Sequence, residues 1–432
     1  WRHGWRRRGR WRGRGWWCVG GASGASGSSA AGGVVGAAPA AGGSVAANAS
    51  KGKGKKSAAA AVPEEAVAIS APAAPGLENK TGQHSCFVNV VVQTLWNVSA
   101  FRDAFLTGKL QDDASEEDSS IYVAMKEVCS MMDSAAAGDR VADPTSKQPR
   151  QATASALKEA LYRLDSNFEL GEMHDATEAH EALLEALHRA VAESRGERDD
   201  GTSSSSPGTS SGGSSGSSDE GSALAGEVRG GPSFVKEIFS MRMRMEYAKP
   251  TDPKEEPSKP LHFDQWTQYI VASELRNAVH EAADGGHTTS PLVRVLRKEA
   301  GTEPVFEGGA PVPVTRKLNM LEPPLVFTLG LSNDSARASK LQISESLQGI
   351  EETLNLRDVY DGLPTDVYCR LVALTAFYES HYVCFCFSQA AGAWIHYDDD
   401  TRRLVGTEFA QVKDKCVMGR LHPQLCFFER AR

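Results

Sequence analysis

The chain has 432 residues, a net charge of −8 and eight cysteines without regular spacing. No apolar run reaches the ~18 residues that a membrane-spanning helix needs, and no secretory signal precedes the cysteines. These features argue against an integral membrane protein and against a disulfide-stapled secreted domain. We therefore expect a soluble protein of a reducing compartment, the cytoplasm or the nucleus, that makes no contact with a membrane.

Residues 1–73 differ in composition from the rest of the chain. Seven arginines fall within the first fourteen positions, a Gly/Ala/Ser-rich stretch follows, and the first acidic residue is Glu64. With so few large aliphatic side chains, we expect this tail to be disordered. It could bind RNA through arginine and tryptophan, target an organelle, or be a solvated tail without function. The chain begins at Trp1 rather than Met, which favours an incomplete gene model over a processed product.

The stretch GLENKTGQHSCFVNVVVQTLWN, residues 76–97, changes at Cys86 from a glycine-containing turn to an apolar, helix-like run. A cysteine at the start of a helix faces the unpaired N–H groups of the first turn, which favour a thiolate. A single cysteine is nevertheless more often a buried, inert residue. Partners elsewhere in the chain must therefore decide whether Cys86 is a nucleophile.

Residues 175–195, DATEAHEALLEALHRAVAESR, predict an amphipathic helix. Asp175 lies where a helix N-terminus favours negative charge. A polar Ser/Gly segment at about residues 195–232 then has nothing to bury, and we expect it to be a disordered insertion. The 3–4 spacing places one apolar stripe on the helix: Ala176, Ala179, Leu183, Leu184, Leu187 and Val191.

The back part of the chain, from about residue 233, changes to short apolar, β-branched and aromatic runs separated by Gly, Pro, Asp or Ser. This pattern predicts the strands of a mostly antiparallel sheet. Helices that come first and strands that come later indicate an α+β fold in which the sheet packs against the helical lobe. The runs are LVFTLGL (325–331), YCRLVALTAFY (368–378), HYVCFCF (381–387), WIHYDD (394–399) and LCFFER (425–430).

His381 is the best placed of the eleven histidines to serve Cys86 as a base, because it begins a strand after a polar turn. Seventeen residues later, a strand ends in Asp398, Asp399 and Asp400, so a hairpin would return a carboxylate to His381. Such a carboxylate fixes the imidazole tautomer and stabilises the imidazolium. Taken singly, His381 could be a core histidine and the aspartates a solvated turn. Together they favour a Cys-His-Asp site.

Three stretches carry a resemblance to a known family. Residues 76–105, 173–190 and 380–406 resemble, in this order, the cysteine, central and histidine boxes of the ubiquitin-specific protease family. Within it, the chain most resembles a plant and algal branch of ubiquitin carboxyl-terminal hydrolase-related proteins. The resemblance implies a papain-like α+β fold with a helical thumb, an antiparallel β palm and fingers, over about residues 74–432.

The activity implied by the resemblance is that of a cysteine-type deubiquitinase, which hydrolyses the bond after the C-terminal glycine of ubiquitin. Cys86 matches the nucleophile, His381 the general base and Asp398 the residue that orients it, while Asp399 matches a position that often assists. The alternative is a catalytically weak or inactive relative that binds ubiquitin as a scaffold.

The resemblance also implies how the partner, ubiquitin or a ubiquitinated protein, is held. Asp175 and Glu178 match acidic positions that bind the arginines of the ubiquitin tail. Their residue types alone are equally explained by ordinary negative charge at a helix N-terminus. The two interpretations are compatible.

The oxyanion donor departs from the family pattern. The asparagine usually found five residues before the cysteine is replaced by Thr81, and Asn79 lies seven residues before Cys86. Losing one such donor costs roughly 10²–10³ in rate in a comparable hydrolase. Gln83, His84 or the backbone N–H of Cys86 could substitute, and the sequence leaves these alternatives open.

No cofactor or metal is expected. Many relatives carry two Cys-x-x-Cys pairs that bind zinc in the fingers, whereas residues 233–266 contain no cysteine. Cys384 and Cys386 form a single Cys-x-Cys within a predicted strand, where alternation puts both on one face. Without a second pair, we expect them to pack in the core rather than to ligate zinc.

Overall fold

The computed structural model describes residues 75–140, 152–192, 232–247, 259–285, 289–301, 305–307, 310–312, 316–333 and 337–430. The predicted tail, residues 1–73, lies outside this part of the chain. So does the predicted Ser/Gly insertion, apart from its last residue, Pro232. Among the described residues, no helix combines the length and the apolar character needed to cross a membrane.

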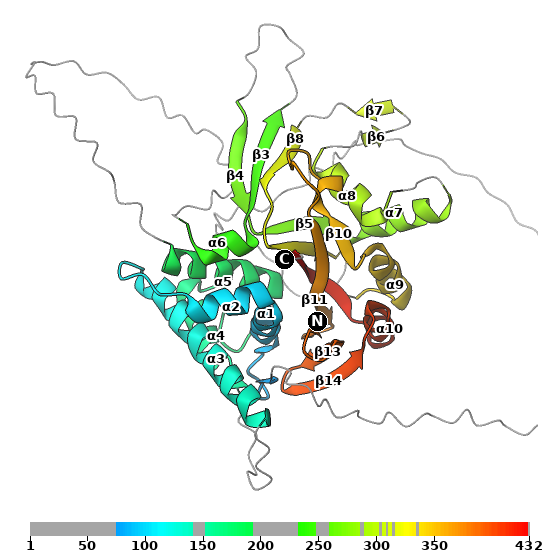
Figure 1. Cartoon of the computed structure of the whole chain (residues 1–432). Helices are drawn as coiled ribbons and strands as arrows, with labels where there is room; N and C mark the ends of the chain where they lie inside the picture. The colour runs from blue at the N-terminus through cyan, green and yellow to red at the C-terminus, as the bar shows by residue number, and fades with distance from the viewer. Residues whose placement is uncertain are drawn as a thin grey trace, which may run out of the picture. The chain divides into compact units, whose positions relative to one another are not determined.

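The helices that come first in the chain form one lobe beside the main sheet (Figure 1). They are α1 (Cys86–Asn97), α2 (Ser99–Thr107), α3 (Glu116–Arg140), α4 (Ser155–Leu164), α5 (Ala176–Val191) and the short α6 (Phe234–Phe239). The predicted amphipathic helix is α5, and all six residues of its predicted stripe are buried. Asp175 is its N-cap, whose carboxylate accepts a hydrogen bond from the Thr177 N–H at 2.6 Å. The predicted start of α5 is therefore confirmed.

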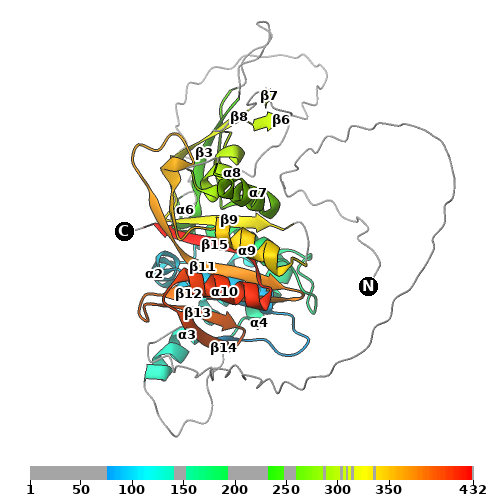
Figure 2. The ribbon, with the colours of Figure 1, turned by 90° about the vertical axis from the view of Figure 1, so that its right-hand side faces the viewer.

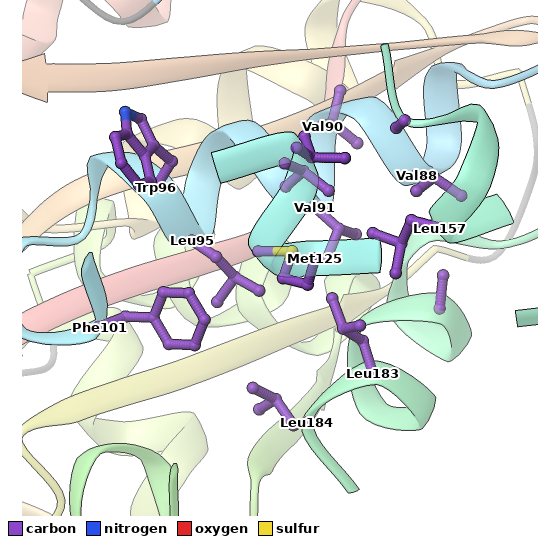
Figure 3. Packing of buried hydrophobic residues seen from close by; sticks show 14 of the residues in the cluster. Val88, Val90, Val91, Leu95, Trp96, Phe101, Met125, Leu157, Leu183 and Leu184 are labelled. Atoms are coloured by element: carbon purple, nitrogen blue, oxygen red, sulfur yellow. The ribbon is translucent and has the colours of Figure 1, made fainter. Parts of the chain in front are cut away.

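Apolar side chains from all six of these helices meet in the core of this lobe. In Figure 3, Val91 and Leu95 of α1 lie near Met125 of α3, with Leu183 of α5 close by. Each of these side chains is at most 2 % exposed. Truncating one such leucine to alanine typically costs about 2–5 kcal/mol, so this core fixes α1, and with it Cys86, relative to the other helices.

The main sheet has eight strands in the order β14-β13-β12-β11-β15-β9-β5, with β10 also paired to β11. Neighbouring strands are antiparallel except β5 and β9, which are parallel. The five strand predictions are confirmed as β9, β11, β12, β13 and β15. The bounds are β5 (Thr267–Val271), β9 (Val326–Ser332), β10 (Thr353–Asn355), β11 (Tyr368–Tyr378), β12 (His381–Ser388), β13 (Ala393–Asp398), β14 (Thr401–Gly406) and β15 (His422–Arg430).

Helices cover both faces of this sheet, as Figures 1 and 2 show. On β12, Cys384 and Cys386 belong to the core shared with the helical lobe, while Phe385 between them belongs to the core on the opposite face. Both cysteines are buried on one face, which confirms the predicted core packing. The opposite core includes α7 (Ala272–Ala283), α8 (Pro291–Glu299), α9 (Lys340–Gly349) and α10 (Phe409–Gly419).

A separate three-stranded antiparallel sheet, in the order β4-β3-β8, extends beyond the main sheet (Figure 1). Its strands are β3 (Met241–Tyr247), β4 (Leu261–Gln265) and β8 (Arg316–Glu322). Two small pairs complete the described strands: β1 (Leu77–Glu78) with β2 (Ala152–Thr153), which are parallel, and β6 (Val305–Glu307) with β7 (Ala310–Val312). A 3-10 turn spans Leu356–Asp358.

Candidate active site

Cys86 is the first residue of α1 and is 2 % exposed. The predicted change from turn to helix at this residue is confirmed. The helix N-terminus directs its unpaired N–H groups toward the side of the thiol, which favours a negative charge there. Across the boundary between the helical lobe and the main sheet, the Cys86 thiol is within side-chain hydrogen-bonding reach of His381.

His381 receives a carboxylate from the neighbouring strand. The hairpin of β12 and β13 brings Asp398 to it, and the distance between His381 Nε2 and Asp398 Oδ1 is 2.7 Å. The predicted hairpin is therefore confirmed. Because Nε2 is engaged by the carboxylate, Nδ1 is the ring nitrogen left to exchange a proton with Cys86.

The hydrogen bond with Asp398 is the largest of the effects that raise the pKa of His381 to about 10, and the Cys86 contact adds to it. The same bond to His381 holds the pKa of Asp398 below its usual value. At neutral pH these shifts favour an imidazolium at His381 beside an ionised Asp398. This is the protonation state that a thiolate–imidazolium pair requires.

Asp399 connects the two lobes. Its Oδ2 accepts a hydrogen bond from Asn79 Nδ2 at 2.9 Å, and its Oδ1 accepts one from Asn89 Nδ2 at 3.0 Å. Its backbone carbonyl accepts the Leu77 N–H at 2.9 Å. Burial raises the pKa of Asp399, and the two amide bonds oppose that rise. Its Oδ2 lies 3.9 Å from His381 Nε2, so it acts on the pKa of His381 through charge rather than through a hydrogen bond, and its assisting role stays a prediction.

Asp399 also has an unusual backbone conformation, with φ at 50°. On the other side of the contact, a Cβ at Gly76 would lie 2.4 Å from backbone atoms of Asp400. Any larger residue at Gly76 would push the two segments apart. The loop before Cys86 is also fixed from the helical lobe, since Leu77 pairs with Ala152 in the parallel pair of β1 and β2.

The candidate oxyanion donors hold the loop together. Asn79 uses both ends of its side-chain amide, because its Oδ1 accepts the Ser85 N–H at 3.0 Å while its Nδ2 donates to Asp399. Gln83 Oε1 accepts the Lys80 N–H at 3.2 Å, which closes a turn of the loop. Thr81 is exposed at the rim of a cavity of about 670 Å³ that Asp398 and Asp399 also line. The identity of the oxyanion donor stays a prediction.

Asp175 and Glu178 lie on the exposed side of α5, at the end nearer Cys86. Tyr382, which follows His381, lies within reach of both Asp175 and Cys86. Burial is the largest cause that raises the pKa of its hydroxyl, and the negative charges of Asp175 and Cys86 raise it further. Burial and the nearby Asp175 also raise the pKa of Glu178. Two carboxylates one helical turn apart thus form an acidic face at the N-terminal end of α5.

Three further residues of the site were not predicted from the sequence. Asn89 binds Asp399, Gly76 permits the close approach of the loop, and Lys158 of α4 donates to loop carbonyls. Asn89 and Lys158 had a signal, since each is a polar residue on the apolar stripe of its helix and both are buried. Gly76 is recognisable only once the partner segment is known.

A metal ion has one candidate set of ligands in the described part of the chain. One donor atom each from His381, Asp398 and Asp399 lie within 4.8 Å of one another. These are the groups that already bind one another around the imidazole, so a cation there would compete with the His381–Asp398 hydrogen bond. The predicted lack of a metal stays a prediction.

Comparisons with known proteins agree with this geometry. A family profile described as "Ubiquitin carboxyl-terminal hydrolase" matches residues 75–419. Ubiquitin carboxyl-terminal hydrolase 53 of Homo sapiens is 24% identical to this chain over 366 residues, and ubiquitin carboxyl-terminal hydrolase 54 of Mus musculus is 24% identical over 363 residues. These alignments cover 82% of this chain but 30% and 20% of the two relatives, so the chain spans less than a third of their length.

Among solved structures, the SAGA DUB module of Ubp8, Sgf11, Sus1 and Sgf73 bound to monoubiquitin is similar, with a TM-score of 0.50 and 12% identity. The match covers 83% of this chain and 69% of that chain. At this identity the likeness concerns the fold, and it confirms the predicted α+β fold, in which the helical lobe is the thumb, the main sheet the palm and the three-stranded sheet the fingers.

Proposed function

This chain belongs to the ubiquitin carboxyl-terminal hydrolase family, and from that premise we propose that it is a thiol-dependent deubiquitinase that cleaves the bond after the C-terminal glycine of ubiquitin. The observation that carries the proposal is the arrangement of Cys86, His381 and Asp398, with Nε2 of the imidazole 2.7 Å from the carboxylate and the thiol near enough to raise the pKa of the imidazole. These three residues come from two lobes and two distant parts of the chain.

The reaction begins with attack of the Cys86 thiolate on the carbonyl carbon of that glycine. The resulting tetrahedral intermediate carries a negative oxygen, which needs N–H donors such as the backbone N–H of Cys86 at the helix N-terminus. His381 is held as an imidazolium by Asp398, so it can protonate the leaving amine as the carbon–nitrogen bond breaks. The glycine is then bound to Cys86 as a thioester.

Water completes the cycle. His381, neutral after giving up its proton, accepts a proton from the attacking water, and the second tetrahedral intermediate collapses to release the ubiquitin carboxylate and the thiolate. Asp398 keeps the same ring orientation in both steps, since it bonds Nε2 while Nδ1 exchanges the protons. Asp399 adds a second negative charge beside the imidazolium.

The ubiquitin tail would approach along α5. Asp175 and Glu178 present two carboxylates on the side of that helix nearer Cys86, and the tail carries arginines. Replacing both by alanine should weaken ubiquitin binding, because charge-assisted hydrogen bonds of this kind contribute roughly 1.5–3 kcal/mol each. Calorimetry with the Cys86→Ala background measures the affinity. An unchanged affinity with a large fall in melting temperature would assign the pair to helix stability alone.

The alternative function is a scaffold that binds ubiquitin without cutting it. The intact set of nucleophile, base and carboxylate favours the enzyme, since binding alone does not require a hydrogen-bonded His381–Asp398 pair. Kinship with the plant and algal branch, location in the cytoplasm or nucleus, and RNA binding or organelle targeting through residues 1–73 stay predictions. Those residues lie outside the described part of the chain.

The direct test is reaction with ubiquitin that bears a C-terminal electrophile, followed by mass spectrometry. We expect one adduct on Cys86 in the wild type and none in Cys86→Ala. The same variant should lose hydrolysis of a ubiquitin C-terminal amide while it retains ubiquitin binding, because the small side chain removed attacks the bond rather than holding the substrate. Amide hydrolysis by Cys86→Ala at the wild-type rate would end the proposal. Binding without any adduct would favour the scaffold.

A further inference from the structure

Lys158 of α4 is a buried lysine directed at the loop that precedes Cys86. Its side chain belongs to the buried stripe of its helix, and the residue is only 5 % exposed. Its ammonium donates to the backbone carbonyl of Gln83 and, at 3.2 Å, to that of His84. It also lies 5.5 Å from the centre of the Phe87 ring. The Lys158 ammonium therefore contacts residues that precede Cys86 in the chain and the residue that follows it.

These contacts fix one peptide unit from both ends. In a trans peptide the C=O and the following N–H point in opposite directions. The His84 carbonyl is held by Lys158, and the Ser85 N–H is held by Asn79 Oδ1 at 3.0 Å. His84 itself has φ at 48°, a left-handed conformation that costs free energy in a residue with a side chain unless its surroundings enforce it. The hydrogen bonds that Lys158 and Asn79 make with this peptide unit hold His84 in that conformation.

The charge of Lys158 also acts on the thiol. Burial lowers the pKa of Lys158, and the negative charge of Cys86 opposes this fall. The attraction is mutual, so the ammonium stabilises the thiolate. The other charged groups at the site are His381, Asp398 and Asp399. With the thiolate they make three anions and one cation, and Lys158 supplies a second cation. Tyr382, which also faces Cys86, carries no charge at neutral pH.

We propose that Lys158 is a positioning residue of the active site, which holds the Gln83 and His84 carbonyls in place and stabilises the Cys86 thiolate. This inference deepens the proposed function and rests on it for its role in turnover. The stabilisation of the thiolate itself can be measured without ubiquitin.

The experiment is alkylation of Cys86 by iodoacetamide between pH 5 and 10, quantified by mass spectrometry of the peptide that contains Cys86. In Lys158→Met we expect the pH of half-maximal alkylation to rise by about one unit, the size of shift that one nearby charge typically causes. Alkylation at pH 6 should then fall about tenfold, while the rate at pH 10 stays within about twofold. Lys158→Arg keeps the charge and should restore most of the wild-type profile.

Lys126→Met is the matched control. Lys126 makes the same kind of contacts, to the Phe105 and Leu106 carbonyls at 2.9 and 3.0 Å and to an aromatic ring at 5.2 Å. These carbonyls lie at the C-terminal end of α2, away from the loop that precedes Cys86. Lys126→Met should therefore lower the melting temperature without moving the alkylation profile.

An unchanged alkylation profile in a folded Lys158→Met would overturn the inference. Should that variant fail to fold, Lys158→Gln keeps a hydrogen-bond donor without the charge and should show the same upward shift. If neither variant folds, Lys158 acts on stability alone and the proposal is wrong. The alkylation profile of Cys86 and the reaction with electrophilic ubiquitin test different claims. If the profile shifts in Lys158→Met but the wild type forms no adduct with electrophilic ubiquitin, the proposed function is refuted and the role of Lys158 stands.

Discussion

The two sides of the active site are positioned by different means. On the sheet side, His381 begins β12 and Asp398 ends β13, so both lie at the same end of an antiparallel hairpin and its register sets their distance. On the helix side, Cys86 follows a loop whose shape depends on individual polar contacts from Asn79 and Lys158. Strand register is determined by many repeated backbone bonds, whereas the loop depends on a few side chains. We therefore expect the helix side to be the more sensitive to mutation away from the reacting atoms.

Among the contacts that join the two sides, one polar and one apolar contact differ most in character. The polar contact is Asp399, which accepts hydrogen bonds from Asn79 and Asn89. The apolar contact is His180 of α5, whose ring packs edge-on against Phe427 of β15 with the ring centres 5.2 Å apart. The polar contact should control the geometry of catalysis, and the apolar one should control the stability of the lobe interface. The predictions below test this division.

The largest effect is expected on the sheet side, from Asp398→Asn. The amide can keep a hydrogen bond to His381 but cannot stabilise an imidazolium, and it favours the wrong tautomer of the ring. We expect kcat/KM on a ubiquitin C-terminal amide to fall by about 10³–10⁴, with little change in melting temperature. Asp366→Asn, which removes a surface carboxylate that accepts hydrogen bonds from Asn355 and Arg357, is the control and should retain full activity.

Activity within tenfold of the wild type in Asp398→Asn would show that register alone does not make this carboxylate catalytic. Asp399 would then be the better candidate for the third catalytic residue, since its Oδ2 is 3.9 Å from the same ring nitrogen.

Much of both sides was predictable from the sequence because it follows local patterns. The hairpin, the stripe of α5 and the start of α1 at Cys86 all come from patterns within about twenty residues. The contacts of Asn79 and Asn89 with Asp399 join residues 320 and 310 positions apart, and no local pattern specifies such a pairing. The same holds for the parallel pairing of β5 with β9.

The prediction that helices come first in the chain and strands come later was also incomplete. Four helices, α7 to α10, lie among the later strands and cover the outer face of the palm. A sheet with strands as apolar as β11 and β12 must be buried on both faces, because each face carries apolar side chains that would otherwise contact water. Continuous apolar runs such as LTAFY and VCFCF thus contained the signal for a second helical layer.

The next effect in size concerns the polar contact. Asp399→Ala removes the carboxylate that accepts hydrogen bonds from the Asn79 and Asn89 side chains. Both amides are then left without this acceptor in a part-buried site. Hydrogen bonds to an ionised group contribute about 1.5–3 kcal/mol each, so with partial compensation by water we expect the free energy of unfolding to fall by about 2–4 kcal/mol in urea titrations. Cys86 alkylation should become less pH-dependent as the loop loosens.

A double-mutant cycle sharpens this prediction. Combining Asp399→Ala with Asn79→Ala should cost less than the sum of the two single changes by about 1 kcal/mol or more, as is usual for residues in direct contact. Strict additivity would mean that Asp399 does not hold the loop through Asn79, and the proposed joint between the two lobes would have to be placed elsewhere.

The smallest effect tests the apolar contact through pH. His180 is completely buried between Phe239 and Phe427, and burial lowers its pKa to about 3. A histidine in an unfolded chain has a pKa near ~6.5, so the folded state resists protonation and its stability is full above that pH. As the pH falls from 6.5 toward 3, the unfolded state takes up the proton first, and stability declines by about 1.4 kcal/mol per unit.

Between pH 7 and pH 5, His180 should therefore cost the wild type about 2 kcal/mol of unfolding free energy, measured by urea titration at both pH values. In His180→Leu this loss should be absent, because leucine fills an apolar site without a titrating group, while the loss from all other groups remains in both proteins and cancels in the comparison. His262→Gln, at an exposed position on β4, should behave as the wild type. If His180→Leu shows the same decline as the wild type, the lobe interface admits water or a counter-charge at His180. The proposed contrast between an apolar contact at His180, from which water is excluded, and a polar contact at Asp399 would then be wrong.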